Sequence, residues 1–139
     1  MIEYNEILLR LILAAVFGGL IGMEREIVHK PAGVRTHMLV SLGSALFILL
    51  ALEAVPSESF PDVISRVIAG VVTGVGFLGA GTIFKSKIEV HGLTTAASIW
   101  AVAGVGLGLG MGYYFMTLVS VVLVLIVLHL NKLEFFKNL

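Results

Sequence analysis

Residues 92–131 read GLTTAASIWAVAGVGLGLGMGYYFMTLVSVVLVLIVLHLN, a stretch of 40 residues without a single Lys, Arg, Asp or Glu. As one α-helix this stretch would be about 60 Å long, roughly twice the hydrocarbon thickness of a bilayer. It must therefore fold back on itself, and the glycine-rich run Gly108–Gly112, just before Tyr113 and Tyr114, predicts where it turns. The stretch predicts two membrane-spanning helices, at about 92–109 and 112–130.

Three further apolar stretches precede this one. Charged side chains are absent from residues 36–52 and 67–84, and residues 7–23 are interrupted only by Arg10. Because a spanning helix needs roughly 20 apolar residues, these stretches predict spans at about 7–23, 38–55 and 66–84. We therefore expect an all-α integral membrane protein with five transmembrane helices in one domain. The prolines all fall in the predicted connections, where they break no helix: Pro31, Pro56 and Pro61.

The composition agrees with this interpretation. The chain is 58% hydrophobic and 13% charged, whereas a soluble domain carries about 25% charged residues. Nine basic and nine acidic residues balance, which gives no electrostatic case for nucleic-acid binding. The absence of cysteine excludes a disulfide, a thiolate metal site and a cysteine nucleophile. The leader before the first span is acidic and no A-x-A site follows, so we expect that span to be retained rather than cleaved.

Basic residues predict the orientation in the membrane. Five spans place the first loop, the third loop and the C-terminus on one side, and basic loops stay in the cytoplasm. That side holds Arg25, Lys30, Arg35, Lys85, Lys87, Lys132 and Lys137, and the other side only Arg10 and Arg66. We therefore expect the N-terminus outside and the C-terminus inside.

Two groups of polar residues are candidate sites. At the cytoplasmic side, an inner polar cluster would combine Glu24, Arg25, Arg35, Thr36, His37, Thr94 and Thr95. At the opposite side, an outer charge cluster would combine Arg10, Glu53, Asp62 and Arg66, with Glu6 at i−4 placed to pair with Arg10. The alternatives are a solvated loop for the inner group and separate side chains reaching the headgroups for the outer group.

Glycines on the predicted spans are expected to be helix-packing positions, because small residues let helix backbones approach in a bilayer. Gly18-x3-Gly22 and Gly70-x3-Gly74 are small-x3-small faces, and the alternating run from Gly104 to Gly112 places glycines on two opposite faces. The segment Gly74-x-Gly76-x2-Gly79 matches a dinucleotide-binding pattern, which we reject because no strand precedes it. The expected packing positions are Gly18, Gly22, Gly70, Gly74, Gly76, Gly79, Gly81, Gly104, Gly108 and Gly112.

Catalytic and metal-binding motifs give little support to an enzyme. The four histidines are scattered, and neither H-E-x-x-H nor G-x-S-x-G occurs. Paired carboxylates such as Glu24 with Glu26, or Glu53 with Asp62, are the weak basis for a Mg²⁺ site. We therefore expect no catalytic residue and no resident cofactor.

Several blocks together resemble the MgtC/SapB family of bacterial membrane proteins. They are Gly18-x3-Gly22-Met-Glu-Arg25, then Ala32-Gly-Val-Arg-Thr-His37, the segment from Arg66 to Gly81, and Gly92-Leu-Thr-Thr-Ala-Ala-Ser-Ile-Trp100. The resemblance implies a multi-pass protein of the bacterial cytoplasmic (inner) membrane, linked to growth at low magnesium and to virulence. It also implies that the polar family positions are Glu24, Arg25, Arg35, Thr36, Arg66, Thr94 and Thr95.

The resemblance bears on partners as well. At least one family member is thought to inhibit the F-type ATP synthase, and many continue into a soluble cytosolic domain. This sequence ends at Leu139, so we expect the membrane domain alone, in a naturally short or a truncated member. The first hypothesis is a non-catalytic regulator that binds membrane proteins, dimerises through glycine faces and contacts the lipid bilayer. The alternatives are a small homo-oligomeric transporter or channel for Mg²⁺ or protons, and lastly an intramembrane enzyme.

Overall fold

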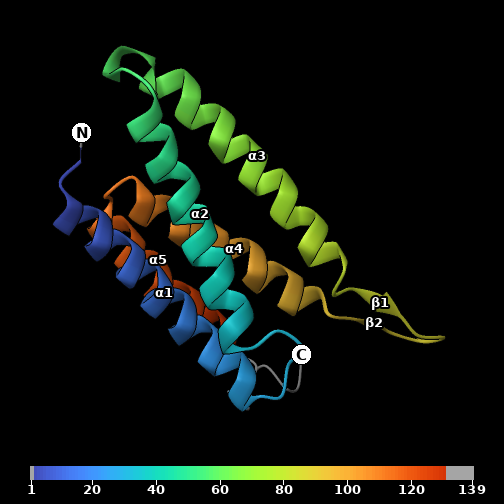
Figure 1. The fold of residues 1–139 in the computed structure, drawn as a ribbon. Coiled ribbons are helices and arrows are strands. Elements are labelled where there is room, and N and C mark those ends of the chain that lie inside the picture. Colours follow the sequence, from blue (N-terminus) through green and yellow to red (C-terminus); the bar gives the residue numbers. More distant parts are fainter. Residues whose placement is uncertain (1, 131–139) are drawn as a thin grey trace.

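The computed structural model describes residues 2–130, which form five α-helices and one short β-hairpin (Figure 1). A 3-10 turn, η1 (Ser57–Ser59), precedes the third helix, and strands β1 (Phe84–Lys85) and β2 (Val90–His91) pair antiparallel before the fourth. The architecture is that of an all-α membrane protein, as the sequence predicts. The helices are α1 (Tyr4–Ile27), α2 (Val34–Ala54), α3 (Phe60–Ala80), α4 (Leu93–Gly110) and α5 (Tyr114–His129).

Helix α4 is the centre of the bundle. It contacts α1, α2, α3 and α5, and more than half of its residues are buried. One core cluster joins α4 to α1, α2 and α5 around Val102, Val105 and Leu109. A smaller cluster around Ile99 and Ala103 joins α4 to Val75 of α3. The small residues of α4 suit its central position, because a helix surrounded by neighbours has little room for long side chains.

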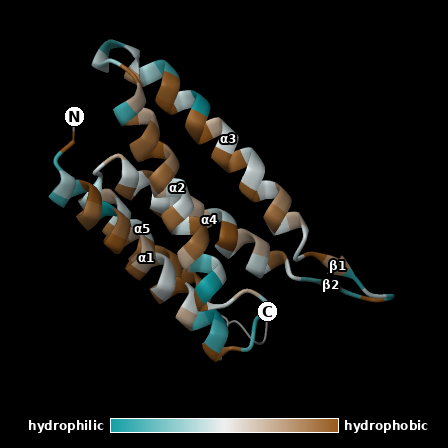
Figure 2. Ribbon diagram, viewed as in Figure 1, coloured by the Kyte–Doolittle hydropathy of each residue, from teal (hydrophilic) through white to brown (hydrophobic). Residues whose placement is uncertain are grey.

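The outward faces of the helices are apolar, and polar residues gather toward the helix ends and connections (Figure 2). Exposed side chains include Leu9, Phe47, Phe77 and Val127. A hydrophobic surface of this extent is stable in lipid and not in water. Four helices, α1 to α4, are long and apolar enough to cross a membrane. Helix α5 is apolar but has 16 described residues, which at 1.5 Å per residue gives about 24 Å.

Both ends of α3 differ from the predicted span. Helix α3 begins at Phe60 rather than near residue 66, so Pro61 lies in its first turn and not in a connection. A proline is tolerated there because the first backbone N–H groups of a helix have no intrahelical partner. The same helix ends at Ala80, and the chain then enters the β-hairpin instead of continuing to residue 84.

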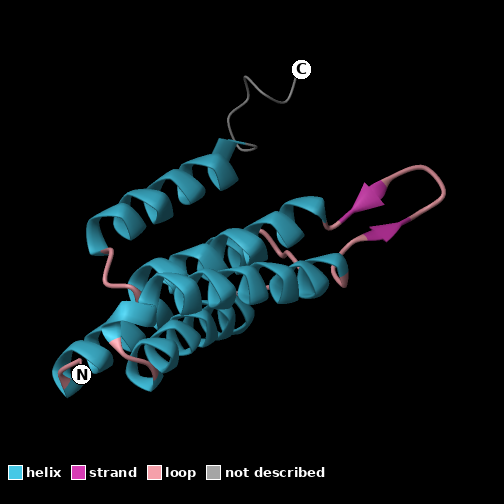
Figure 3. Cartoon of the chain, turned by 90° about the horizontal axis from the view of Figure 1, so that it is seen from above, coloured by secondary structure: helices cyan, strands magenta, loops and turns pink. Residues whose placement is uncertain are grey.

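The predicted turn after the fourth span is present. Helix α4 ends at Gly110, and Gly112 adopts φ = +81°, a left-handed conformation that favours glycine. The start of α1, η1 and this turn lie at one end of the bundle, which we call the N-terminal end. The α1–α2 loop and the hairpin lie at the opposite end (Figure 1). Figure 3 shows the hairpin projecting beyond the helices and α5 at the side of the bundle. Lys132 and Lys137, used for the orientation, lie outside the described residues.

Candidate functional site

The predicted inner polar cluster is divided by burial into two parts. Arg25, His37 and Thr95 are at most 3% exposed, whereas Arg35, Thr36 and Thr94 are exposed at the surface. Glu24 is half-buried beside Arg25. The buried members form two separate groups of contacts, and the exposed members join neither.

The first group surrounds His37, which links α2 to α4. Its Nδ1 lies 2.9 Å from the carbonyl oxygen of Gly33, and its Nε2 lies 3.0 Å from Oγ of Ser98. Since a carbonyl can only accept, Nδ1 carries a proton, and in the neutral ring Nε2 then accepts from the Ser98 hydroxyl. That hydroxyl also lies 2.8 Å from the carbonyl oxygen of Thr95. Ser98 therefore has one proton for two acceptors in a fully buried position.

The second group surrounds Arg25, which links α1 to the end of α5. Its guanidinium pairs with the carboxylate of Glu24, and its Nη2 lies 3.5 Å from the carbonyl oxygen of Leu128. The last carbonyls of a helix have no intrahelical donor, so a cation there satisfies the helix end. Among the described residues, Oε1 of Glu24 is buried without a hydrogen-bond partner.

A polar recess lies beside the exposed members of the inner cluster. It has a volume of about 350 Å³ and is lined by Lys30, Arg35, Thr36 and Glu26. Oε2 of Glu26 accepts a hydrogen bond of 2.9 Å from the backbone N–H of Val34, at the start of α2. This carboxylate therefore satisfies the first turn of the helix. Within residues 2–130, no three acidic or histidine side chains are arranged to hold a metal ion.

The sequence reasoning missed several buried polar residues. Ser41 and Ser44 follow His37 at i+4 and i+7 on one face of α2, and both are at most 3% exposed. This spacing of polar residues along an apolar span was the available signal. Ser98 and Thr117, which are also buried, had no comparable signal. Together with Arg25, His37 and Thr95, these residues place polar groups inside a bundle whose core is otherwise apolar.

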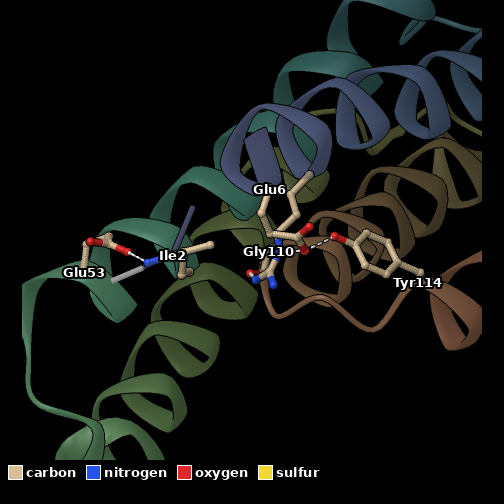
Figure 4. A network of polar contacts seen from close by, with 6 residues as sticks. Ile2, Glu6, Glu53, Gly110 and Tyr114 are labelled. Atoms are coloured by element: carbon tan, nitrogen blue, oxygen red, sulfur yellow. Dashed lines mark hydrogen bonds and ion pairs between the residues drawn. The ribbon is translucent and has the colours of Figure 1, made fainter. Parts of the chain in front are cut away.

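At the N-terminal end, Arg10 connects three helices. Its Nε donates to Oε1 of Glu6 at 2.9 Å, the pair expected from the i, i+4 spacing, and its Nη1 donates to the carbonyl of Gly110 at 2.8 Å. The hydroxyl of Tyr114 donates to the same oxygen of Glu6 (Figure 4). The network ties α1 to the C-terminal end of α4 and the start of α5.

The other members of the outer charge cluster are not joined to Arg10. Oε1 of Glu53 accepts from the backbone N–H of Ile2 at 2.6 Å (Figure 4). Glu53 and Arg10 also line one recess of about 380 Å³. Asp62 and Arg66 are exposed on α3 and line no part of this recess. The structure therefore brings together two of the four predicted residues.

The predicted packing glycines have two different surroundings. On α1, a Cβ atom at Gly18 would lie 2.6 Å from the carbonyl oxygen of His37, and one at Gly22 would lie 2.7 Å from Cα of Val34. These positions therefore require glycine. At the other extreme, a Cβ atom would meet no atom within 4 Å at Gly70, Gly74, Gly76 and Gly104.

Two of the remaining glycines, both on α4, lie where α4 packs closely against α2. A Cβ atom at Gly106 would collide with the carbonyl oxygen of Ser41, and one at Gly110 would lie 2.8 Å from that of Ala45. Gly108 faces Thr117, and Gly112 faces Arg10. A Cβ atom at Gly79 would make ordinary contact with Ala96, and one at Gly81 would lie 3.3 Å from the carbonyl oxygen of Leu78 in the preceding turn. The contacts with α2 are thus made by positions 106 and 110, whereas a Cβ atom at the predicted packing position Gly104 would meet no atom within 4 Å.

An apolar groove of about 630 Å³ lies between α2 and α3. Its α2 wall includes Gly43 and Phe47, and its α3 wall includes Gly70, Gly74 and Leu78. Helix α3 is packed less closely than its neighbours, since only Val75 and Gly79 are buried on it. The groove therefore leaves a small-residue face of α3 without a neighbour in the described chain.

The sequence is similar to that of several known proteins. The model of the MgtC family matches residues 11–135. YhiD of Escherichia coli (strain K12), which is named as a proposed magnesium transporter, is 47% identical over 109 residues, covering 72% of this chain and 48% of YhiD. Protein MgtC of Brucella abortus (strain 2308) is 48% identical over 92 residues, covering 66% of this chain and 37% of that protein.

Protein SrpB of Synechococcus elongatus is 43% identical over 106 residues, covering 69% of this chain and 58% of SrpB. The chain thus spans between 37% and 58% of the length of these three relatives. No solved structure matches the sequence.

Proposed function

The chain belongs to the MgtC family, and we propose that it is a non-catalytic, multi-pass protein of the bacterial inner membrane that acts by binding other membrane proteins. The exposed apolar surface of four long helices supports the multi-pass part. The observation that carries the binding part is the groove between α2 and α3.

The groove has the properties of a helix-binding surface in lipid. Association of helices in a bilayer depends on close backbone approach at small residues, since lipid tails are as apolar as leucine side chains. Gly70 and Gly74 are one helical turn apart on α3 and open onto the groove beside Gly43 of α2. We therefore propose a transmembrane helix of a partner protein as the occupant, with its backbone against the two α3 glycines.

The partner and the setting are proposed from the family. The name of the Escherichia coli relative YhiD refers to magnesium transport, and this supports a role in adaptation to low magnesium. In a pathogenic bacterium, we propose that this role contributes to virulence. The resemblance to the MgtC/SapB family supports the F-type ATP synthase as the partner. A second copy of this chain is the competing occupant, because the same glycines would also serve a homodimer.

We propose five spans, with the N-terminus outside and the C-terminus inside. Lys30 in the α1–α2 loop, Arg35 in the first turn of α2, and Lys85 and Lys87 in the hairpin lie at the same end of the bundle (Figure 1), as basic residues of cytoplasmic loops do. Helix α5 would be the fifth span, its shorter apolar length accommodated by local thinning of the bilayer.

Substitution of Gly74 tests the binding proposal. Gly74→Leu fills the groove, and Gly104→Leu is the matched control, since Gly104 is equally open but lies on α4 outside the groove. We expect Gly74→Leu to abolish co-purification of F-type ATP synthase subunits from membranes, while Gly104→Leu retains it. Equal recovery of the synthase with both variants would contradict the groove as the binding surface. Light scattering in detergent detects the homodimer separately.

A transporter is the second candidate, and the buried polar interior favours it. Arg25, His37 and Ser41 lie within an apolar bundle, where polar residues commonly mark an ion pathway. Against this, Gly18 and Gly106 place α1 and α4 in direct contact with the backbone of α2 at His37 and Ser41, so the three helices are closely packed at these two residues. Mg²⁺ or proton flux in proteoliposomes that is lost in His37→Ala would favour the transporter.

A further inference from the structure

The hairpin between α3 and α4 exposes an unusual amount of apolar surface for so short an element. Ile88 at its tip is 93% exposed, and Phe84, Val90 and Ile83 are 58%, 49% and 39% exposed. Two lysines, Lys85 and Lys87, are exposed among them. An isolated two-stranded hairpin is marginally stable in water, so this combination calls for surroundings that accept both apolar and basic side chains.

The hairpin is held in one shape by its own contacts. Ser86 and Glu89 close the turn, with the backbone N–H of Ser86 donating to the carbonyl of Glu89 at 2.9 Å and that of Glu89 donating to Oγ of Ser86 at 3.1 Å. The rings of Phe84 and His91 stack with centroids 5.1 Å apart. At the base, Gly92 has φ = +87° and lies against the carbonyl of Thr82. The contacts in the turn, between the strands and at the base of the hairpin therefore hold Ile88 at its tip in a defined position.

The position of the hairpin in the chain places it at the membrane surface. It begins shortly after α3 ends at Ala80 and finishes just before α4 begins at Leu93. Because both helices are long and apolar enough to span, their connected ends lie at the bilayer boundary, where headgroups meet acyl chains. Figures 1 and 3 show the hairpin projecting from these ends beyond the bundle, on the side away from α5.

We propose that the β1–β2 hairpin is a lipid-binding element that docks into the headgroup layer of a membrane containing anionic phospholipids. Phe84, Ile88 and Val90 enter the boundary of headgroups and acyl chains, and the ammonium groups of Lys85 and Lys87 meet lipid phosphates. The charge is complementary, because the two lysines outweigh Glu89, the one acidic side chain of the hairpin. This inference does not rest on the partner-binding proposal.

Site-directed spin labelling in vesicles tests the docking directly. The chain has no cysteine, so Ile88→Cys and Glu89→Cys each give one label, and the second leaves all the apolar side chains in place. Ser57→Cys, on η1 at the other end of the bundle, is the control. We expect vesicles of phosphatidylcholine with phosphatidylglycerol, compared with phosphatidylcholine alone, to make positions 88 and 89 more accessible to oxygen and less accessible to a water-soluble nickel chelate. Position 57 should not change.

Removal of the two lysine charges distinguishes lipid recognition from simple exposure. A lysine near an anionic surface changes the ratio of docked to undocked hairpin about fivefold, so Lys85→Gln with Lys87→Gln should lower it about 25-fold. Added salt should act in the same direction, since it screens exposed charges. Labels that stay equally accessible to the nickel chelate in both vesicles, or a shift that survives the double substitution, would overturn the proposal. Co-purification of the synthase would be unaffected by that result.

Discussion

Arg10 in the first helix donates a hydrogen bond of 2.8 Å to the carbonyl oxygen of Gly110, the last residue of the fourth helix. The bond joins residues 100 positions apart in the sequence. It satisfies a helix-end carbonyl that has no intrahelical donor, in a place where the surrounding side chains are largely apolar.

Replacement of Arg10 should therefore weaken the bundle. In Arg10→Met the carbonyl of Gly110 loses its side-chain donor, and the carboxylate of Glu6 keeps only the hydroxyl of Tyr114 as a donor. An unpaired buried polar group costs about 1–3 kcal/mol. Thermal unfolding in detergent should show a lower midpoint than for the native chain. Arg66→Met is the control, because Arg66 is exposed on α3; equal midpoints for the two variants would show that the Arg10 network adds no stability.

Two glycines of α4 should respond in opposite directions to the same substitution. Gly106→Ala drives a methyl group into the carbonyl of Ser41, and overpacking of this kind costs about 1–3 kcal/mol. Gly104→Ala meets only open space, so stability should be unchanged or should rise by about 0.5–1 kcal/mol through the lower flexibility of alanine. Denaturant titration in mixed micelles measures both. A loss of stability in Gly104→Ala as large as that in Gly106→Ala would contradict this packing of α4.

The His37 contacts predict a graded effect. Ser98→Ala removes the 3.0 Å partner of Nε2, which should cost about 1–3 kcal/mol of unfolding free energy because the ring is left buried with one unpaired nitrogen. Ser98→Thr keeps the hydroxyl and should retain more of the stability than Ser98→Ala. Denaturant titration in mixed micelles measures these differences. Thr94→Ala is the control, because Thr94 is exposed one turn earlier on α4, and its free energy of unfolding should change by no more than about 0.5 kcal/mol.

Cysteine accessibility should establish the topology. In intact cells, a membrane-impermeant maleimide should label Ser57→Cys, and should label Ser86→Cys only after the membrane is opened, because the basic hairpin is expected in the cytoplasm. A reporter fused after Leu139 should share the side of residue 86 if α5 spans the bilayer. Labelling of residue 86 in intact cells would reverse the orientation that we propose.

The sequence was sufficient to locate the helices but not their ends. Charge-free stretches reveal membrane segments because an ionisable residue at the centre of a bilayer costs about 2.5–3.5 kcal/mol. Near the membrane surface a charged residue has no such cost and can continue a helix, so charges there do not show where the helix ends. Helix α1 therefore runs through Glu24, Arg25 and Glu26 to Ile27, and α3 begins before Asp62 and Arg66.

The candidate site was predictable only where contacts are local. The Glu6–Arg10 pair follows from i, i+4 spacing on one helix and is present. The contacts of His37 with Ser98, and of Arg10 with Gly110, depend on the rotation of separate helices against each other, which no spacing in the sequence encodes. For the same reason, glycines on both faces of α4 could not show which face meets α2.

The central position of α4 has a consequence for the order of assembly during synthesis. Helices α1 and α2 pack extensively against each other and can pair as soon as both have entered the membrane. Helix α3 has more contacts with α4 than with α2, and α4 is made after it. Until α4 (18 residues) has entered the membrane, α3 would therefore lie in the lipid with only α2 beside it, and the insertion of α4 would then join α3 to the rest of the bundle.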